Sequence, residues 1–316
     1  MNFTLNVLGT ASAKPTTNRN SSAQVLDVRG RLFLIDCGEG TQRQMCRQKL
    51  SFERIDAIFI SHIHGDHVFG LFGLLSTIAL ATRRTSIRIF GPNALGPVLK
   101  FFKSYYGDQV GISLDFTPVK TKSPEVIFEN KFLTVEAFPL NHRIETYGYL
   151  FREKTPQLNV RKDAIEKYGL GIAEICRLKN GGDVVREDSE GNVVERIANG
   201  DVTFLPYKPR SFAYCSDTAP FPELSPWVRG VDLLYHETTY MADMEKDAAA
   251  RFHSTTLQAA ACAKEAGAGK LIAGHYSSRY RDTAPLLQEL CSVFPDSYAA
   301  DDGDVFDIPL IKTDRL

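Results

Sequence analysis

The chain alternates between short apolar runs rich in β-branched residues and longer stretches with helical spacing. The short runs predict strands, and they are TLNVLG (4–9), AQVLDV (23–28), RLFLID (31–36), DAIFIS (56–61), SIRIFG (86–91), LDFTPV (114–119), FLTVEAFPL (132–140), SFAYCSD (211–217), VDLLYHE (231–237) and KLIAGH (270–275). The longer stretches predict helices at 40–49, 68–81, 92–106 and 256–267. Strands alternating with helices predict an α/β fold with the strands inside and the helices outside.

Local signals define both ends of this pattern. The first three strands read as an antiparallel set, because Arg29-Gly30 forms a turn between the second and the third. Near the other end, Thr255 and Gln258 have the spacing of a capping box, which predicts that the alanine-rich helix starts there.

Residues from about Arg152 to Pro209 have a different character. This segment has weak periodicity and contains the turn-forming stretches KTPQ, GLG, NGGD and SEGN. Its first half is basic, whereas Asp183 to Glu195 is acidic apart from Arg186. We therefore expect a single domain over 1–316 that carries an inserted, flexible arm at 152–209. A plain surface loop with solvated charges is the alternative that the local sequence leaves open.

The composition limits the classes of function. Of 316 residues, 43% are hydrophobic and 24% charged, as in ordinary globular proteins, and the formal net charge is −1. Nucleic-acid binding must therefore depend on local positive charge or on metal. The N-terminus lacks the features of a signal peptide, and the apolar stretch 68–81 is too short to span a bilayer. The six cysteines form no C-x-x-C pair, so we expect reduced thiols in a cytoplasmic protein without membrane contact.

Polar residues capable of binding metal follow many of the predicted strands. They are Asp36, His62, His142, Asp217, His236 and His275. In α/β sheets, ligands bind at the carboxyl ends of strands. A single histidine at such a position is more often structural than a ligand, so the argument depends on several of them coinciding.

The stretch ISHIHGDH (60–67) holds three of the seven histidines. Residues two apart point the same way in extended backbone, so His62 and His64 can reach one metal ion. Asp66 and His67 follow Gly65, where the chain reverses, and can face a second ion. Imidazole and carboxylate ligands suit Zn²⁺, with Mn²⁺ or Fe as alternatives. Mixed ligands in this number favour an open catalytic site over a closed structural one.

The H-x-H-x-D-H motif resembles that of the metallo-β-lactamase superfamily, and the rest of the chain fits it from end to end. The resemblance implies an αββα sandwich with two Zn²⁺ per subunit. One ion would take His62, His64 and His142, and the other Asp66, His67 and His275. Asp217 would bridge the two ions, and Asp36 would support the first motif from behind.

Further motifs resemble those of ribonuclease Z, the endonuclease family that trims the 3′ trailers of tRNA. They are LLYHETTY (233–240), RFHSTTLQAA (251–260), LGTASAKPTTNRNSSA (8–23), LIDCGEGTQRQM (34–45), AYCSDT (213–218), GYLF (148–151) and LKNGG (178–182). In the family's P-T-K-x-R-N loop this chain reads Pro15-Thr16-Thr17-Asn18-Arg19-Asn20, so the lysine is missing. The arm also lacks the family's usual Gly/Pro-rich knuckle before LK.

The resemblance implies three catalytic residues and a polyanionic substrate. Asp66 would orient or deprotonate the attacking water, and His253, oriented by Glu237, would protonate the leaving 3′-oxygen. His236 would be structural; a capping role at the following helix is the alternative for His253. Precursor tRNA would bind through basic residues, with the candidates Arg19, Lys154, Arg161, Lys162, Arg177 and Lys179. The family works as a homodimer, and no organic cofactor is expected.

Two other functions compete with this interpretation. A small-molecule phosphodiesterase, arylsulfatase or lactonase on the same fold would have no use for a long charged arm. A non-catalytic RNA-binding scaffold would be expected to have lost some of the candidate ligands, whereas this chain keeps all seven.

Overall fold

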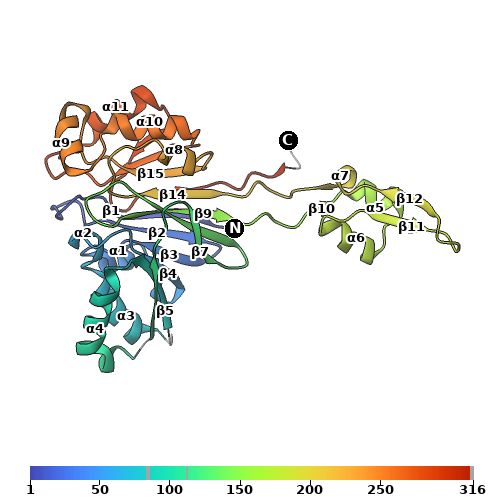
Figure 1. The fold of residues 1–316 in the computed structure, drawn as a ribbon, viewed down its shortest axis with the longest axis horizontal. Coiled ribbons are helices and arrows are strands. Elements are labelled where there is room, and N and C mark those ends of the chain that lie inside the picture. Colours follow the sequence, from blue (N-terminus) through green and yellow to red (C-terminus); the bar gives the residue numbers. More distant parts are fainter. Residues whose placement is uncertain (83–85, 112, 314–316) are drawn as a thin grey trace. The chain divides into compact units, whose positions relative to one another are not determined.

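The computed structural model describes residues 1–82, 86–111 and 113–313, and most of the predicted strands form within one residue or two of their expected bounds (Figure 1). The chain divides into two compact units, which are described separately. The first consists of 1–152 and 211–308, and the second of 153–210 and 309–316.

Seven strands build the first sheet of the first unit. In spatial order they are β18 (Val305–Asp307), β1 (Phe3–Gly9), β2 (Ala23–Val28), β3 (Arg31–Ile35), β4 (Ile55–Phe59), β5 (Ser86–Pro92) and β6 (Ser113–Val119). The pairs β1–β2 and β2–β3 are antiparallel, as predicted for the first three strands. The pair β18–β1 is antiparallel too, and the pairs from β3 to β6 are parallel. The parallel strands bring their carboxyl ends to one edge.

A second sheet of seven strands comes mainly from the C-terminal half of the sequence. In spatial order its strands are β17 (Ser297–Ala299), β16 (Leu271–Gly274), β15 (Leu233–Glu237), β14 (Ser211–Cys215), β9 (Tyr147–Glu153), β8 (Leu133–Pro139) and β7 (Glu125–Glu129). The strands from β14 to β17 run parallel, so their carboxyl ends also meet at one edge.

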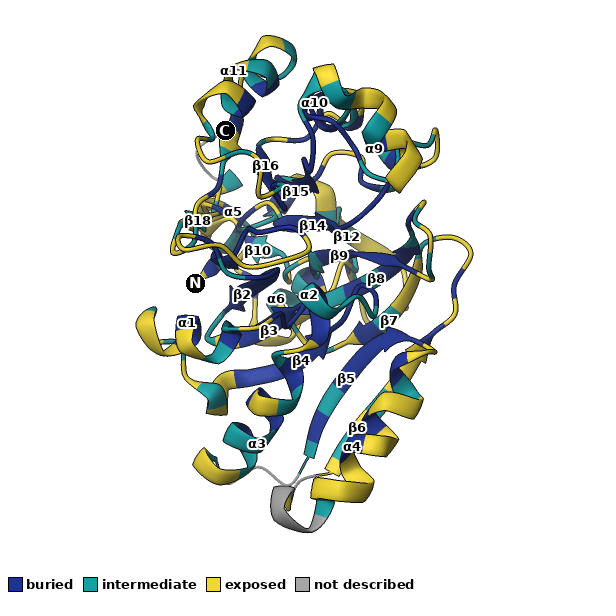
Figure 2. Ribbon diagram, turned by 90° about the vertical axis from the view of Figure 1, so that its left-hand side faces the viewer, coloured by how far each residue is buried: buried dark blue, intermediate teal, exposed yellow. Residues whose placement is uncertain are grey.

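The two sheets face each other across an apolar core, and helices cover their outer faces (Figures 1 and 2). The helices and 3₁₀ turns of this unit are α1 (Thr41–Arg47), η1 (Phe52–Arg54), α2 (Gly65–Val68), α3 (Leu71–Ala81), α4 (Leu95–Val110), α8 (Leu224–Trp227), η2 (Ala242–Met244), α9 (Glu245–Arg251), α10 (Thr256–Ala266) and α11 (Ala284–Val293). The αββα sandwich expected from the sequence is therefore confirmed. Among the described residues, no helix combines the length and the apolar character that a membrane span requires.

The second unit has regular structure and a small core of its own. It contains β10 (Asn159–Val160), α5 (Lys162–Tyr168), α6 (Ile172–Lys179), β11 (Val184–Glu187), β12 (Val193–Ile197), α7 (Asn199–Val202) and β13 (Thr203–Phe204). Val160, Leu178 and Ile197 belong to its buried cluster. Arg186 on β11 pairs with Glu174 on α6 and with Glu195 on β12, and it also donates to the Tyr168 carbonyl. These contacts tie the hairpin to both helices.

Several elements differ from their expected form. The helix expected from residue 92 starts at Leu95, and the apolar stretch 68–81 breaks at Gly70, between α2 and α3. Gly70 packs so closely that a Cβ there would lie 2.0 Å from the Gly38 carbonyl oxygen. His236, which was predicted at the end of a strand, is the penultimate residue of β15 and is buried. The capping box of α10 forms as expected, with the Thr255 hydroxyl accepting from the Gln258 amide.

Candidate metal centre

Seven polar side chains converge where the carboxyl edges of the two sheets meet. They follow β4, β8, β14 and β16 or lie in the short helix α2, and they are His62, His64, Asp66, His67, His142, Asp217 and His275. Segments that are distant in sequence thus supply one site, as the rule for strand ends predicts. Their potential ligand atoms fall into two groups that share Asp217.

The first group contains three imidazoles and one carboxylate. His62 Nε2 lies 3.0 Å from His64 Nδ1, and His142 Nε2 lies 3.4 Å from the same nitrogen. Asp217 Oδ2 completes the group at 3.6 Å from His62 Nε2. Burial lowers the pKa of His62 well below its usual value, which favours the neutral imidazole that binds metal.

The second group combines His67, His275 and Asp66 with the other oxygen of Asp217. The two Nε2 atoms lie 3.2 Å apart, and Asp66 Oδ2 is 3.5 Å from each. Asp217 Oδ1 lies 3.4 Å from His67 Nε2 and 3.2 Å from His275 Nε2. One carboxylate therefore presents one oxygen to each group.

Hydrogen bonds from behind orient these imidazoles. His67 donates through Nδ1 to Asp36 Oδ2 at 2.8 Å, and His142 donates through Nδ1 to the Phe252 carbonyl at 3.0 Å. Asp36 also accepts from Ser61 and from the Tyr214 hydroxyl. With Nδ1 occupied, His67 and His142 turn Nε2 toward their groups, which is the usual way in which proteins orient metal-binding histidines.

Backbone strain is concentrated at the same place. Asp36, His275, Phe252 and Ala13 all have a positive φ, between 56° and 64°, although none is glycine. Ala13 is the middle residue of a tight turn between Ser12 and Lys14, and its amide donates to Asp66 Oδ2 at 2.7 Å. Such strain persists where the surrounding structure holds it, and it is common at functional sites.

His253 and Glu237 form a separate pair at the edge of the two groups. His253 Nδ1 donates to Glu237 Oε1 at 2.8 Å, and Glu237 is fully buried. Burial alone would lower the pKa of His253, but the Glu237 carboxylate raises it to about 9. The amides of Thr218, Thr239 and Ser254 donate to Glu237 and fix its position. The pair therefore presents a protonated imidazole to the site.

His253 lies outside helix α10, whose cap is Thr255, so the alternative capping role does not apply to it. His236 donates through Nδ1 to the Glu237 carbonyl, and it belongs to neither metal-binding group.

The basic residues expected to bind substrate have different surroundings. Arg19 is mostly buried, donates to the Tyr280 carbonyl, and lies over the Tyr276 ring. It thus anchors the loop 15–20. The other candidates belong to the second unit, in which Arg161, Lys162 and Arg177 are exposed, while Lys154 and Lys179 are partly exposed.

The site opens into a cavity of about 840 Å³, with lining residues that the sequence analysis did not single out. They include Lys14, Arg143, Arg251, Glu39 and Phe69. Arg143 and Arg251 lie close to His142 and His253 in sequence, and Lys14 adjoins the loop 15–20. That proximity was the available signal, but it does not distinguish side chains that enter the cavity from those that leave it.

The donors fit a divalent metal. Each group brings three or more nitrogen and oxygen atoms within 4.8 Å of one another, and several of them are ring nitrogens that face each other. Two acceptor nitrogens at 3.0–3.2 Å need a proton or a cation between them. Hard oxygen and borderline nitrogen donors suit a divalent ion.

Comparisons with known proteins agree with this geometry. The family model described as the beta-lactamase superfamily domain matches residues 187–276, and the model for the anti-Pycsar protein Apyc1 matches residues 3–155. A ribonuclease Z from Bacteroides fragilis is 41% identical over 298 residues, which cover 94% of this chain and 96% of that protein.

Two solved structures resemble the whole chain. The short form of human tRNase Z has a TM-score of 0.70 at 25% identity, with 97% of this chain and 99% of that chain covered. The metallo-β-lactamase fold protein YhfI from Bacillus subtilis has a TM-score of 0.67 at 18% identity, covering 97% and 99%, and shows the shared fold.

Proposed function

The chain belongs to the ribonuclease Z family, and on that premise we propose that it is a metal-dependent endoribonuclease that removes the 3′ trailer from precursor tRNA. The observation that carries the proposal is the pairing of a two-group metal centre with the His253–Glu237 pair in one open cavity. The products would be tRNA with a 3′-hydroxyl and a trailer with a 5′-phosphate. We propose that the enzyme works in the cytoplasm.

We propose that two Zn²⁺ ions per subunit occupy the groups, with His62, His64 and His142 at one, Asp66, His67 and His275 at the other, and Asp217 between them. Bound divalent ions offset the charge of a phosphodiester and lower the pKa of water. Metal analysis of the purified protein would distinguish zinc from manganese and iron.

The side chains of the site have complementary parts in the reaction. Asp66, held by the Ala13 amide, orients the attacking water and accepts its proton. The water oxygen forms a bond to phosphorus while the bond from phosphorus to the 3′-oxygen breaks. His253 donates its proton to that leaving oxygen, and Glu237 keeps the imidazole charged and aimed.

Substrate binding is the function that we propose for the second unit. Its exposed basic residues on and beside α5 and α6 offer charge to the tRNA backbone, whereas the molecule as a whole is nearly neutral. A small-molecule hydrolase would have no need of this unit. Removal of the second unit should therefore impair a tRNA-cleaving enzyme but not a small-molecule hydrolase.

Removing the second unit should weaken cleavage of precursor tRNA and spare hydrolysis of bis-p-nitrophenyl phosphate. Strands β9 and β14 pair antiparallel up to Arg152 and Ser211, so Asn-Gly in place of 154–209 closes them with a tight turn. The chain would end at Ile308. Steady-state kinetics on the two substrates provide the measurement.

A milder variant serves as the control for this deletion. The triple substitution of Arg161, Lys162 and Arg177 by alanine should raise KM for precursor tRNA. It should also reduce the slope of log affinity against log salt by about one for each phosphate that the variant leaves unneutralised. If the deletion lowered activity on both substrates equally, the proposal that the second unit serves tRNA binding alone would be contradicted.

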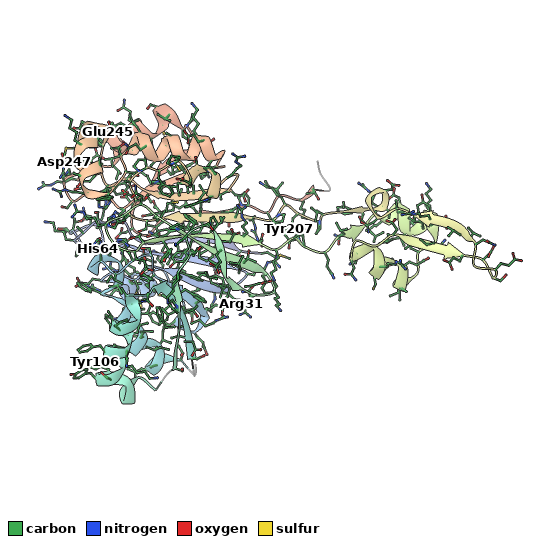
Figure 3. All side chains as sticks on the ribbon, in the orientation of Figure 1. Arg31, His64, Tyr106, Tyr207, Glu245 and Asp247 are labelled. Carbon is green, nitrogen blue, oxygen red and sulfur yellow. The ribbon has the colours of Figure 1, made fainter. Side chains whose placement is uncertain are left out.

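We also propose that the protein is a homodimer in which the second unit of one subunit holds tRNA for the site of the other. An apolar groove of about 440 Å³ between α3 and α4 supports this proposal. Phe101 and Tyr105 on α4 are 63% and 70% exposed, and Figure 3 shows Tyr106 on the same helix at the surface. Exposed apolar faces of this kind are typical of interfaces between proteins.

Substituting Phe101 and Tyr105 together by lysine should convert the dimer into a monomer. Like charges would meet across the interface, and Lys100 and Lys103 on the same helix add to the repulsion. Analytical ultracentrifugation should give twice the 35.2 kDa chain mass for the wild type and one chain mass for the variant. Val126→Lys, at another exposed apolar position, should remain a dimer. A monomeric wild type would refute the proposal.

A further inference from the structure

Phe69 stands at the catalytic cavity with its aromatic ring largely in water. It is 70% exposed, and it lines the cavity together with His64, Asp66 and His253. The nearby residues Val68 and Leu71 belong to the buried core. The surrounding fold therefore offers apolar burial close by, yet this ring faces the site.

The position of the ring is built into the metal-binding loop. A Cβ at Gly65 would lie 2.3 Å from the Phe69 ring, so the ring packs directly on the Gly65 backbone. The Phe69 amide donates to the Gly65 carbonyl, and the Gly70 amide donates to the Cys37 carbonyl. The backbone is thus held on both sides of Phe69. One side of the ring is supported, and the rest is open to a ligand.

The cavity around Phe69 has the charges that a nucleic-acid strand requires. Lys14, Arg143 and Arg251 line it, against one carboxylate outside the metal groups, that of Glu39. Cations match phosphates, and an open aromatic ring matches the face of a nucleobase. Because every base has such a face, stacking serves an enzyme whose substrates differ in sequence.

We propose that Phe69 is a stacking platform for a nucleobase next to the scissile phosphate, either the last base of the tRNA or the first base of the trailer. This inference rests on the proposed function, and it gives Phe69 a role in positioning the phosphodiester between the metal groups. Phe69 follows α2 in the N-terminal half of the sandwich, whereas His253 follows α9 in the C-terminal half, and both line the one cavity.

The first test is a set of substitutions with precursor tRNA as substrate. Phe69→Ala should raise KM by about 5- to 100-fold, the range expected when one stacked base is no longer supported. Phe69→Tyr and Phe69→Trp should restore KM to within about threefold, whereas Phe69→Leu, apolar but without an aromatic face, should not. Tyr298→Ala removes an exposed aromatic ring outside the cavity and should leave KM unchanged. Rescue by leucine would overturn the proposal.

The second test removes the base instead of the ring. Substrates with an abasic nucleotide on either side of the cleavage point identify the stacked position. An abasic nucleotide at the stacked position should lower cleavage by the wild type about as much as Phe69→Ala lowers cleavage of the normal substrate. Cleavage of the abasic substrate by Phe69→Ala should be only slightly lower still. Independent effects that multiply would show that Phe69 acts only on the fold of the loop, and would overturn the proposal.

A binding measurement separates this inference from the proposed function. RNA with 2-aminopurine at the same two positions should be more strongly quenched when bound to the wild type than to Phe69→Ala. This readout needs no cleavage, so an RNA that binds with quenching but is not cut would refute the nuclease function alone. Equal quenching in both proteins would refute the stacking platform alone.

Discussion

His253→Ala is expected to lower the turnover of precursor tRNA by about 10²- to 10⁴-fold, the usual contribution of a positioned general acid. The 3′-oxygen of a ribose is a poor leaving group unless it is protonated. His253 lines the cavity, and its bond of 2.8 Å to Glu237 keeps the imidazole charged. Among the described side chains, only that of His253 donates to Glu237 Oε1, so no other imidazole takes its place in the variant.

The leaving group shows whether His253 acts as a proton donor. p-Nitrophenolate leaves without a proton, so His253→Ala should lower hydrolysis of bis-p-nitrophenyl phosphate by less than about tenfold. Glu237→Gln should reduce cleavage of precursor tRNA in the same selective way, because it removes the charge that holds the imidazole protonated. Metal content should stay at the wild-type level in both variants.

His253 could instead be a metal ligand, and the His253→Ala variant also tests this alternative. Asp217, His253 and His275 also lie close enough to hold an ion together. If His253→Ala lost metal and lowered both activities equally, His253 would be a ligand and the role of proton donor would be wrong.

Asp217→Ala is expected to abolish both activities, by more than about 10³-fold each, since metal stabilises transition-state charge by several kcal/mol. Its two oxygens face the two groups at 3.2–3.8 Å from their histidine nitrogens. Removing it therefore weakens both groups at once, because each group is deprived of an oxygen ligand and of the negative charge that the two share.

Asp66→Ala provides the matched comparison, because Asp66 belongs to the second group alone. Metal analysis by mass spectrometry should find two equivalents in the wild type, about one in Asp66→Ala, and less than one in Asp217→Ala. Asp247→Ala, on helix α9, removes a carboxylate outside both groups and should keep both metals (Figure 3). Equal metal content in the Asp66 and Asp217 variants would contradict the shared role of Asp217.

The strands were predictable because the core between the sheets selects apolar, β-branched residues in short runs. The central strand β9 was not predicted, although nearly all of its residues are buried. The edge strands β7, β17 and β18 and the short β10 to β13 were not predicted either, since few of their residues are buried and their pattern is correspondingly weak. The second unit was expected to be a flexible arm. Its buried cluster around Val160 and Leu178 and the ion pairs of Arg186 depend on contacts across many residues of sequence.

The candidate metal ligands were predicted from the sequence, whereas the side chains that line the cavity around them were not. Histidine is rare, with seven residues in the chain, so its position after strands carries information, and strand ends meet by the geometry of the sheet. Basic and aromatic side chains are common on any surface. Lys14, Arg143 and Phe69 became candidates only when the cavity showed where they point.

By itself, the sequence indicated an α/β fold with a metal site at strand ends, from strand periodicity and the clustered histidines. Through its resemblance to ribonuclease Z it implied the αββα class, the candidate metal ligands and the pairing of His253 with Glu237. The tertiary structure added which oxygen of Asp217 faces which group, and it alone decided that Arg19 anchors a loop and that Phe69 faces the cavity. The physical reason is that the direction of a side chain depends on packing between segments distant in sequence, such as Gly70 against Gly38, which no local pattern records.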